Sequence, residues 1–150
     1  MKLAEALQER ADLNRRLEQL RGRLTRNATV QEGEQPAEDP AVLLEEVETA
    51  AARLEELTAA VNKTNTAVRV EGKSLTELIA RKDALALKLS LYRALLEEAS
   101  DLTDRVSRKE IKVVSTVNVR ELQKTADDMS RELRLTDNAL QQANWTFDLI

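Results

Sequence analysis

Apolar residues recur at spacings of three and four over most of this chain, and no other feature of the sequence restricts its fold as strongly. Between Lys2 and Asn27 the recurring positions are Leu3, Ala6, Leu13, Leu17, Leu20 and Leu24. This spacing places them on one face of an α-helix. Because a helix with one apolar stripe must bury that stripe against another element, the pattern predicts a mainly α protein.

Three further segments carry the same pattern, and residues that favour helix termini bound them. Helices are expected at about 2–27, 40–69, 74–104 and 118–143, with an acidic surface loop at 28–39. Asp39 before Pro40 predicts an N-cap followed by proline at the first helical position. The spacing S-x-x-E at 74–77 and N-x-x-E at 118–121 predicts two further N-terminal caps.

These helices are long enough to bury their stripes against one another. The expected architecture is a single helical domain, residues 1–150, with long antiparallel helices forming a four-helix bundle or paired helical hairpins. The short connection at Gly72 predicts that segments 40–69 and 74–104 form one such hairpin. Asn65 is expected at a stripe position, where a buried amide fixes the register of helix packing. That stripe is expected at Leu44, Val47, Ala51, Leu54, Val61 and Val68.

The stretch "EIKVVSTVNVRELQK" at 110–124 departs from the helical pattern. Its apolar residues Ile111, Val113, Val117 and Val119 alternate at a period of two, which predicts a short β segment near 111–118. A lone strand leaves its backbone groups unpaired, so this one needs a partner. The candidates are the segment "NATVQE" around Val30 and the same segment of a second subunit; an extended connector without a ladder is the alternative.

Composition removes several kinds of chemistry. The chain contains no Cys and no His, which excludes disulfides, thiolate metal sites and imidazole catalysis. No cofactor is predicted. A net charge of −4 argues against general affinity for nucleic acid or anionic lipid. Without a secretion signal or a long apolar run, the sequence favours a soluble cytoplasmic protein that does not bind membranes.

Carboxylates offer the one candidate catalytic group. All-α nucleoside triphosphate pyrophosphohydrolases hold Mg²⁺ with acidic residues from adjacent helices. Here the corresponding residues are Glu45, Glu46, Glu98 and Asp101. The heptad pattern directs these side chains mostly outward, so a solvated acidic face is favoured over a metal site.

Two basic groups offer a candidate phosphate or nucleic-acid surface. They comprise Arg15, Arg16, Arg21, Arg23 and Arg26 in the first helix, and Arg105, Arg108, Lys109 and Lys112 before the alternating segment. Cations suit the C-terminal end of a helix, and the acidic loop that follows the first group can neutralise it. The second group lacks the aromatic residues that stack on bases.

With these segments placed, the chain resembles a bacterial family whose members are labelled septicolysin or septicolysin-like. The matching stretches are "MKLAEAL..RADL", "VQEGE.PAEDP", "NKTN", "SRKEIKVVSTVNVRELQK..DDM" and "NWT". The label implies a thiol-activated cytolysin, and this chain departs from that pattern because it has no cysteine. The resemblance implies no catalytic or binding residues.

The sequence therefore favours a non-enzymatic, self-associating structural or interaction module over the magnesium-dependent hydrolase. A homo-oligomer is expected. The residues expected at its interface are Val113 and Val117 of the alternating segment and Trp145 and Phe147 of the C-terminal tail. Trp is among the residues that most often anchor interfaces, and a freely mobile aromatic tail would expose apolar surface. Docking of the tail on the end of its own helical bundle is the alternative.

Overall fold

The fold consists of helical hairpins, as the apolar spacing predicts. A computed structural model describes residues 1–102 and 111–150. The helices of this described part are α1 (Leu3–Arg26), α2 (Pro40–Ala67), α3 (Leu75–Ser100) and α4 (Val119–Thr146), and the strands β1 (Arg69–Val70) and β2 (Lys73–Ser74) form a small sheet. The mainly α class is confirmed, and the helix termini lie within a few residues of the predicted ones.

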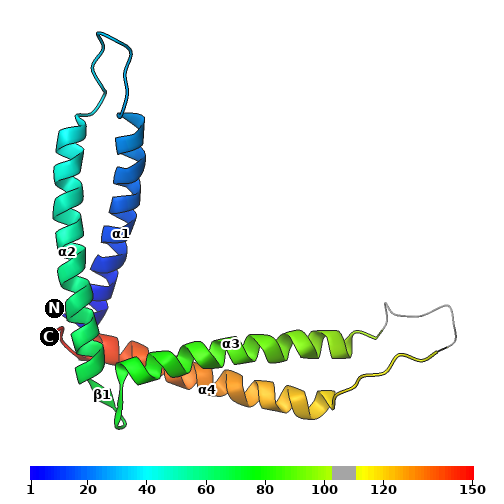
Figure 1. The fold of residues 1–150 in the computed structure, drawn as a ribbon. Coiled ribbons are helices and arrows are strands. Elements are labelled where there is room, and N and C mark those ends of the chain that lie inside the picture. Colours follow the sequence, from blue (N-terminus) through cyan, green and yellow to red (C-terminus); the bar gives the residue numbers. More distant parts are fainter. Residues whose placement is uncertain (103–110) are drawn as a thin grey trace. The chain divides into compact units, whose positions relative to one another are not determined.

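The chain divides into two compact units. The first contains residues 1–69 and 143–150, and the second contains residues 70–142. In the first, α1 and α2 lie side by side and antiparallel; in the second, α3 and α4 do the same (Figure 1). Within the units, α2 packs on α1 and α3 packs on α4. Segments 40–69 and 74–104 belong to different units, so the hairpin expected from them stays a prediction. The prediction of a single domain stays a prediction.

Helix α2 buries one residue in every seven against α1. The buried residues of α2 are Leu43, Ala50, Leu57, Val61 and Thr64. Four of them stand at 43, 50, 57 and 64, which is the heptad spacing of helices that pack along their length. Val61 is also a position of the predicted stripe. The predicted stripe was one residue off at Leu44 and Ala51, and Leu44 is 51% exposed. Both registers are apolar in this part of the sequence, so only the packing on α1 distinguishes them.

Ion pairs connect α1 to α2, and to Glu38 in the loop just before α2, along the same seam. The residues of α1 that form them are also seven apart, and their partners descend in number as α1 ascends, as antiparallel helices require. The pairs are Glu9 with Arg53 (Oε1 to Nε, 2.7 Å), Arg16 with Glu46 (Nη2 to Oε2, 3.1 Å) and Arg23 with Glu38 (Nε to Oε2, 3.0 Å). The charges thus reinforce the register that apolar burial sets.

The buried polar residue of α2 is Thr64, one position before the predicted Asn65. Its hydroxyl donates a hydrogen bond to the carbonyl of Ala60 (2.8 Å) and accepts one from the backbone N–H of Ile150 (2.9 Å). The C-terminal tail also pairs with the N-terminus, through a 3.0 Å bond from the Leu3 N–H to the Phe147 carbonyl. The backbone of the tail is therefore docked on its own chain.

The second unit begins at a tight turn and contains a separate apolar cluster. The hydroxyl of Ser74 accepts a hydrogen bond from the Glu77 N–H, and the Glu77 carboxylate accepts one from the Ser74 N–H, so the predicted capping box is present. Asn118 likewise caps α4 through the Glu121 N–H. Between α3 and α4 the cluster contains Leu89, Leu96, Ala126 and Met129.

The short β element lies at 69–74, and the prediction of a strand at 111–118 was wrong. Residues 111–118 contain no strand, and neither does the segment around Val30. Burial does alternate along the segment, with Val113 and Val117 half-buried between exposed neighbours. The period of two thus predicted the half-burial of Val113, Val117 and Val119, but it was wrong for Ile111, which is 71% exposed. The same pattern did not predict whether the segment hydrogen-bonds to a second strand. For β1 and β2, the tight turn at 71–72 brings the two strands side by side, and segment 111–118 has no such turn. Pairing with a second subunit stays a prediction.

We expect Thr64→Val to lower the free energy of unfolding by about 1–3 kcal/mol, because it leaves the Ile150 N–H without its acceptor. Urea unfolding followed by circular dichroism measures the change. Thr66→Val is the matched control, since Thr66 makes the same backward bond, to the Asn62 carbonyl, on an exposed face. Equal losses in the two variants would contradict a role for the tail contact.

The ion pairs of the first unit also make a pH-dependent contribution. The hydrogen bond from Arg53 lowers the pKa of Glu9, and that from Arg23 lowers the pKa of Glu38, both from an ordinary value of 4.5. In acid, the unfolded chain therefore binds protons more readily than the folded chain does. The contribution of these ion pairs to the free energy of unfolding is present above about pH 4.5. It is lost as the pH falls through the lowered pKa values of the two carboxyl groups in the folded state.

We expect an NMR titration of the Glu9 carboxyl carbon to give a pKa below the ordinary range, and Arg53→Gln to return it to that range. Arg15→Gln is the control, because Arg15 pairs with Asp12 on the exposed side of α1. If the pKa of Glu9 were the same with and without Arg53, the ion pair would not persist in solution.

Candidate ligand pocket and outer helix face

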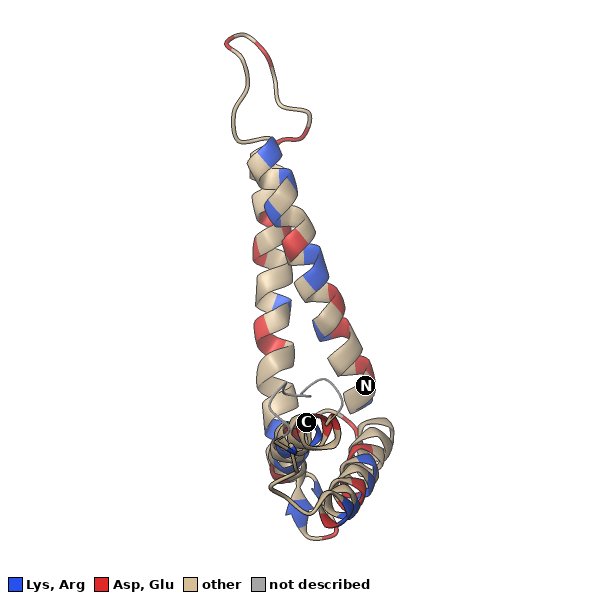
Figure 2. Cartoon of the chain, turned by 90° about the vertical axis from the view of Figure 1, so that its right-hand side faces the viewer, with Lys and Arg blue, Asp and Glu red and all other residues tan. Residues whose placement is uncertain are grey.

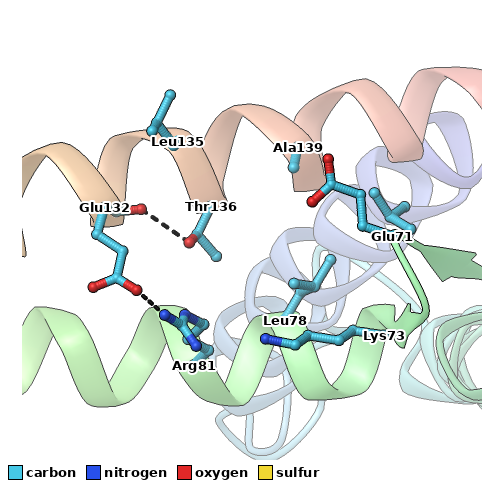
Figure 3. A pocket seen from close by; sticks show the side chains of 9 residues that line it. Glu71, Lys73, Leu78, Arg81, Glu132, Leu135, Thr136 and Ala139 are labelled. Atoms are coloured by element: carbon cyan, nitrogen blue, oxygen red, sulfur yellow. Dashed lines mark hydrogen bonds and ion pairs between the residues drawn. The ribbon is translucent and has the colours of Figure 1, made fainter.

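A pocket lies within the second unit, where the β1–β2 turn meets α3 and α4 (Figure 3). Its volume is about 440 Å³, within the range of small-molecule sites. The apolar lining consists of Val70, Leu78, Leu135 and Ala139. Charged residues from the turn and from both helices complete the wall, so the pocket combines an apolar surface with ionic groups.

One wall of the pocket is held by an ion pair between the helices. The guanidinium of Arg81 on α3 contacts the carboxylate of Glu132 on α4. One turn further along α4, the hydroxyl of buried Thr136 donates a 2.9 Å hydrogen bond to the Glu132 carbonyl. A second pair, Lys82 with Asp137 at 2.6 Å, crosses between the same helices. These contacts fix the spacing of α3 and α4 at the pocket.

Two further charges come from the turn itself. The ammonium of Lys73 points along α3 toward Arg81, whereas the carboxylate of Glu71 points toward Ala139 of α4 (Figure 3). Within the described part of the chain, the side chains of Glu71 and Lys73 form no hydrogen bond or ion pair, and both residues are exposed. The pocket therefore has one uncompensated cation and one uncompensated anion on different sides.

The turn that carries these residues is strained at Glu71. The φ of Glu71 is 50° and that of Gly72 is 83°. Positive φ at both central residues defines the two-residue hairpin turn that favours Asn-Gly, because asparagine tolerates this conformation better than longer side chains do. A glutamate here costs stability, and its carboxylate lies at the pocket.

A second surface is the outer face of α3. Leu87, Leu91 and Leu95 are 65%, 64% and 44% exposed, although Leu89 and Leu96 of the same helix are buried. Leu91 follows Leu89 by two residues, which turns its side chain by about 200° around the helix. Helix α3 is therefore apolar on two opposite faces, and only one of them is covered by α4.

Sequence reasoning missed both features. The dipeptide Glu-Gly between "RV" and "KS" is a weak form of the hairpin-turn signal and could have located the turn. The outer leucines could have been found from "ALALKLSLYRALL" at 84–96, which contains more leucines than one apolar stripe of a helix can hold.

The four carboxylates considered for magnesium are divided between the two units. Within residues 1–102 and 111–150, no three acidic side chains come together as a metal ion would need. Glu45 and Glu46 belong to the first unit, whereas Glu98 and Asp101 belong to the second. Glu46 is already paired with Arg16.

The expected interface residues differ in exposure. Trp145 is 61% exposed, whereas Phe147 is half-buried. Val113 and Val117 are also half-buried. Trp145 is thus available to a partner, and its role in an interface stays a prediction.

The basic groups considered for phosphate are largely neutralised. In the first group, pairs within the hairpin compensate Arg15, Arg16, Arg21 and Arg23. Figure 2 shows both signs of charge interspersed along α1 and α2. Of the second group, Arg105, Arg108 and Lys109 lie outside the described residues. Across the described ranges, no helix combines the length and apolar character that crossing a bilayer requires.

Comparison with known proteins gives a family and a close structural likeness. Residues 10–149 match the model of a family described as a family of unknown function (DUF6847). No curated protein matches the chain. It is similar to a solved structure described as that of a functionally unknown conserved protein from Corynebacterium diphtheriae, with 40% sequence identity and a TM-score of 0.91 over 100% of this chain and 99% of that one.

We expect Glu71→Asn to raise the thermal midpoint by about 2–4 °C, since it relieves roughly 1 kcal/mol of backbone strain. Differential scanning calorimetry measures the shift. Gly72→Ala is the opposing control, because its φ of 83° disfavours any Cβ, and it should lower the midpoint. If both variants melted like the parent chain, the positive φ values would not describe the turn in solution.

Proposed function

The chain belongs to the DUF6847 family, whose function is unknown, and we propose that it acts as a non-enzymatic interaction module that self-associates through the outer face of α3. The exposed leucines Leu87, Leu91 and Leu95 carry this proposal. A helix that is apolar on all sides is typical of one that is buried on all sides. Exposed apolar surface of this kind marks interaction sites.

The spacing of these leucines favours a second copy of the chain as the partner. They stand four residues apart and form one ridge along α3, of the kind that packs into the groove of a facing helix. A two-fold interface requires that residue i contacts j and that j contacts i. When two α3 helices cross antiparallel at Leu91, Leu87 of each meets Leu95 of the other, so the ridge is complementary to itself.

No observation favours the magnesium-dependent hydrolase over this module. The proposal places the protein in the cytoplasm, without a membrane or nucleic-acid partner. The resemblance to septicolysin-like proteins stays a prediction that carries no activity. The tail residue Trp145 is the competing interface, because its side chain is also exposed.

We expect light scattering to give the mass of a dimer for the parent chain and of a monomer for Leu91→Lys, because a buried ammonium at the two-fold axis cannot be paired. Helix content should stay unchanged. Leu44→Lys is the matched control, since Leu44 is similarly exposed on α2, and it should remain dimeric.

Cross-linking tests the geometry directly, because the chain contains no cysteine. A short bis-maleimide should couple Leu91→Cys to itself, and should couple Leu87→Cys to Leu95→Cys more readily than either to itself. A monomeric parent chain would refute self-association. A dimer that survives Leu91→Lys but dissociates with Trp145→Ser would refute the α3 interface and assign it to the tail.

A further inference from the structure

We propose that the pocket between the β1–β2 turn, α3 and α4 binds a small zwitterion, a molecule with a carboxylate and an ammonium group joined by an apolar chain. The pocket does not include the outer leucines of α3, so this inference is independent of self-association. It rests on the charges of the lining, their placement and the strain at Glu71.

The lining charges cancel, which selects against ligands of a single sign. Lys73 and Arg81 contribute two positive charges, and Glu71 and Glu132 contribute two negative charges. An anion alone would approach two carboxylates, and a cation alone would approach two basic groups. A ligand with both signs can satisfy each, since complementary placement of charge gives specificity.

The unpaired charges lie at different sides of the apolar surface. Lys73 points toward Arg81 along α3, so the two together can hold a carboxylate; guanidinium groups bind carboxylates well even when one of their edges is occupied. Glu71 points toward α4 and can hold an ammonium group. Leu78 and Ala139 supply apolar contact for a chain that joins the two.

The backbone at Glu71 supports a binding role for its carboxylate. Asparagine would suit the positive φ better, yet the position holds a residue whose side chain extends to the pocket. Residues kept in sparsely populated conformations cluster at functional sites. Substitution of Glu71 therefore distinguishes its effect on the stability of the turn from its effect on ligand binding. A residue that suits the positive φ better should stabilise the turn and at the same time remove the contact with the ligand.

The test uses the full chain, labelled with ¹⁵N and titrated with 6-aminohexanoate. We expect saturable shifts of the amides of residues 70–73, Arg81 and Thr136. Hexanoate and hexylamine are the matched probes, each lacking one charge, and both should bind at least about tenfold more weakly. Equal binding of hexanoate would overturn the zwitterion in favour of an anion site.

Variants locate the site. Lys73→Gln and Glu71→Asn should each weaken 6-aminohexanoate binding by about tenfold or more, although Glu71→Asn leaves the fold at least as stable. Lys88→Gln and Glu55→Gln are the charge controls outside the pocket and should bind as the parent chain does. Binding that survives both pocket variants, or no saturable binding at millimolar concentration, would overturn the proposal.

Discussion

Burial of one residue in every seven along α2 is the interaction on which the first unit depends. Leu43, Ala50 and Leu57 are almost completely buried, and their spacing lets α1 pack along the helix. The ion pairs lie beside this seam and favour one register of α2 against α1. They add little to the free energy of unfolding, since exposed pairs contribute about 0–1 kcal/mol. The last buried position, Thr64, then serves as the attachment point for the tail.

The predictable parts of this structure were those that depend on local sequence alone. Asp39, Ser74 and Asn118 cap helices because their side chains reach neighbouring N–H groups, and this needs no tertiary information. The stripe of α2 was mispredicted at Leu44 and Ala51, although its residue Val61 is buried, because adjacent apolar residues such as Leu43 and Leu44 allow two registers. The pocket was not predictable, since its charged residues come from the turn, α3 and α4.

The two units use their charges differently. In the first, the arginines of α1 are paired with carboxylates of the same hairpin, which leaves a surface of balanced charge. In the second, Glu71 and Lys73 are not paired within the described residues, and leucines of α3 face outward. Charged side chains without an ion-pair partner, backbone strain and exposed apolar area thus occur together in residues 70–142. The strain and the exposed apolar area cost stability in a monomer, and recognition of other molecules is the usual compensation.

The pairing of Lys2 with Asp148 gives the chain the connectivity of a ring. Joining residues so far apart in sequence carries a loop entropy that grows only slowly with length, by about 0.6 kcal/mol for each doubling. The ends also cannot fray separately, because releasing either one breaks the bonds of the other. A circular permutant, with a peptide link between the present ends and new termini in the exposed loop between α1 and α2, should keep every helix. Only the order of the helices along the chain would change.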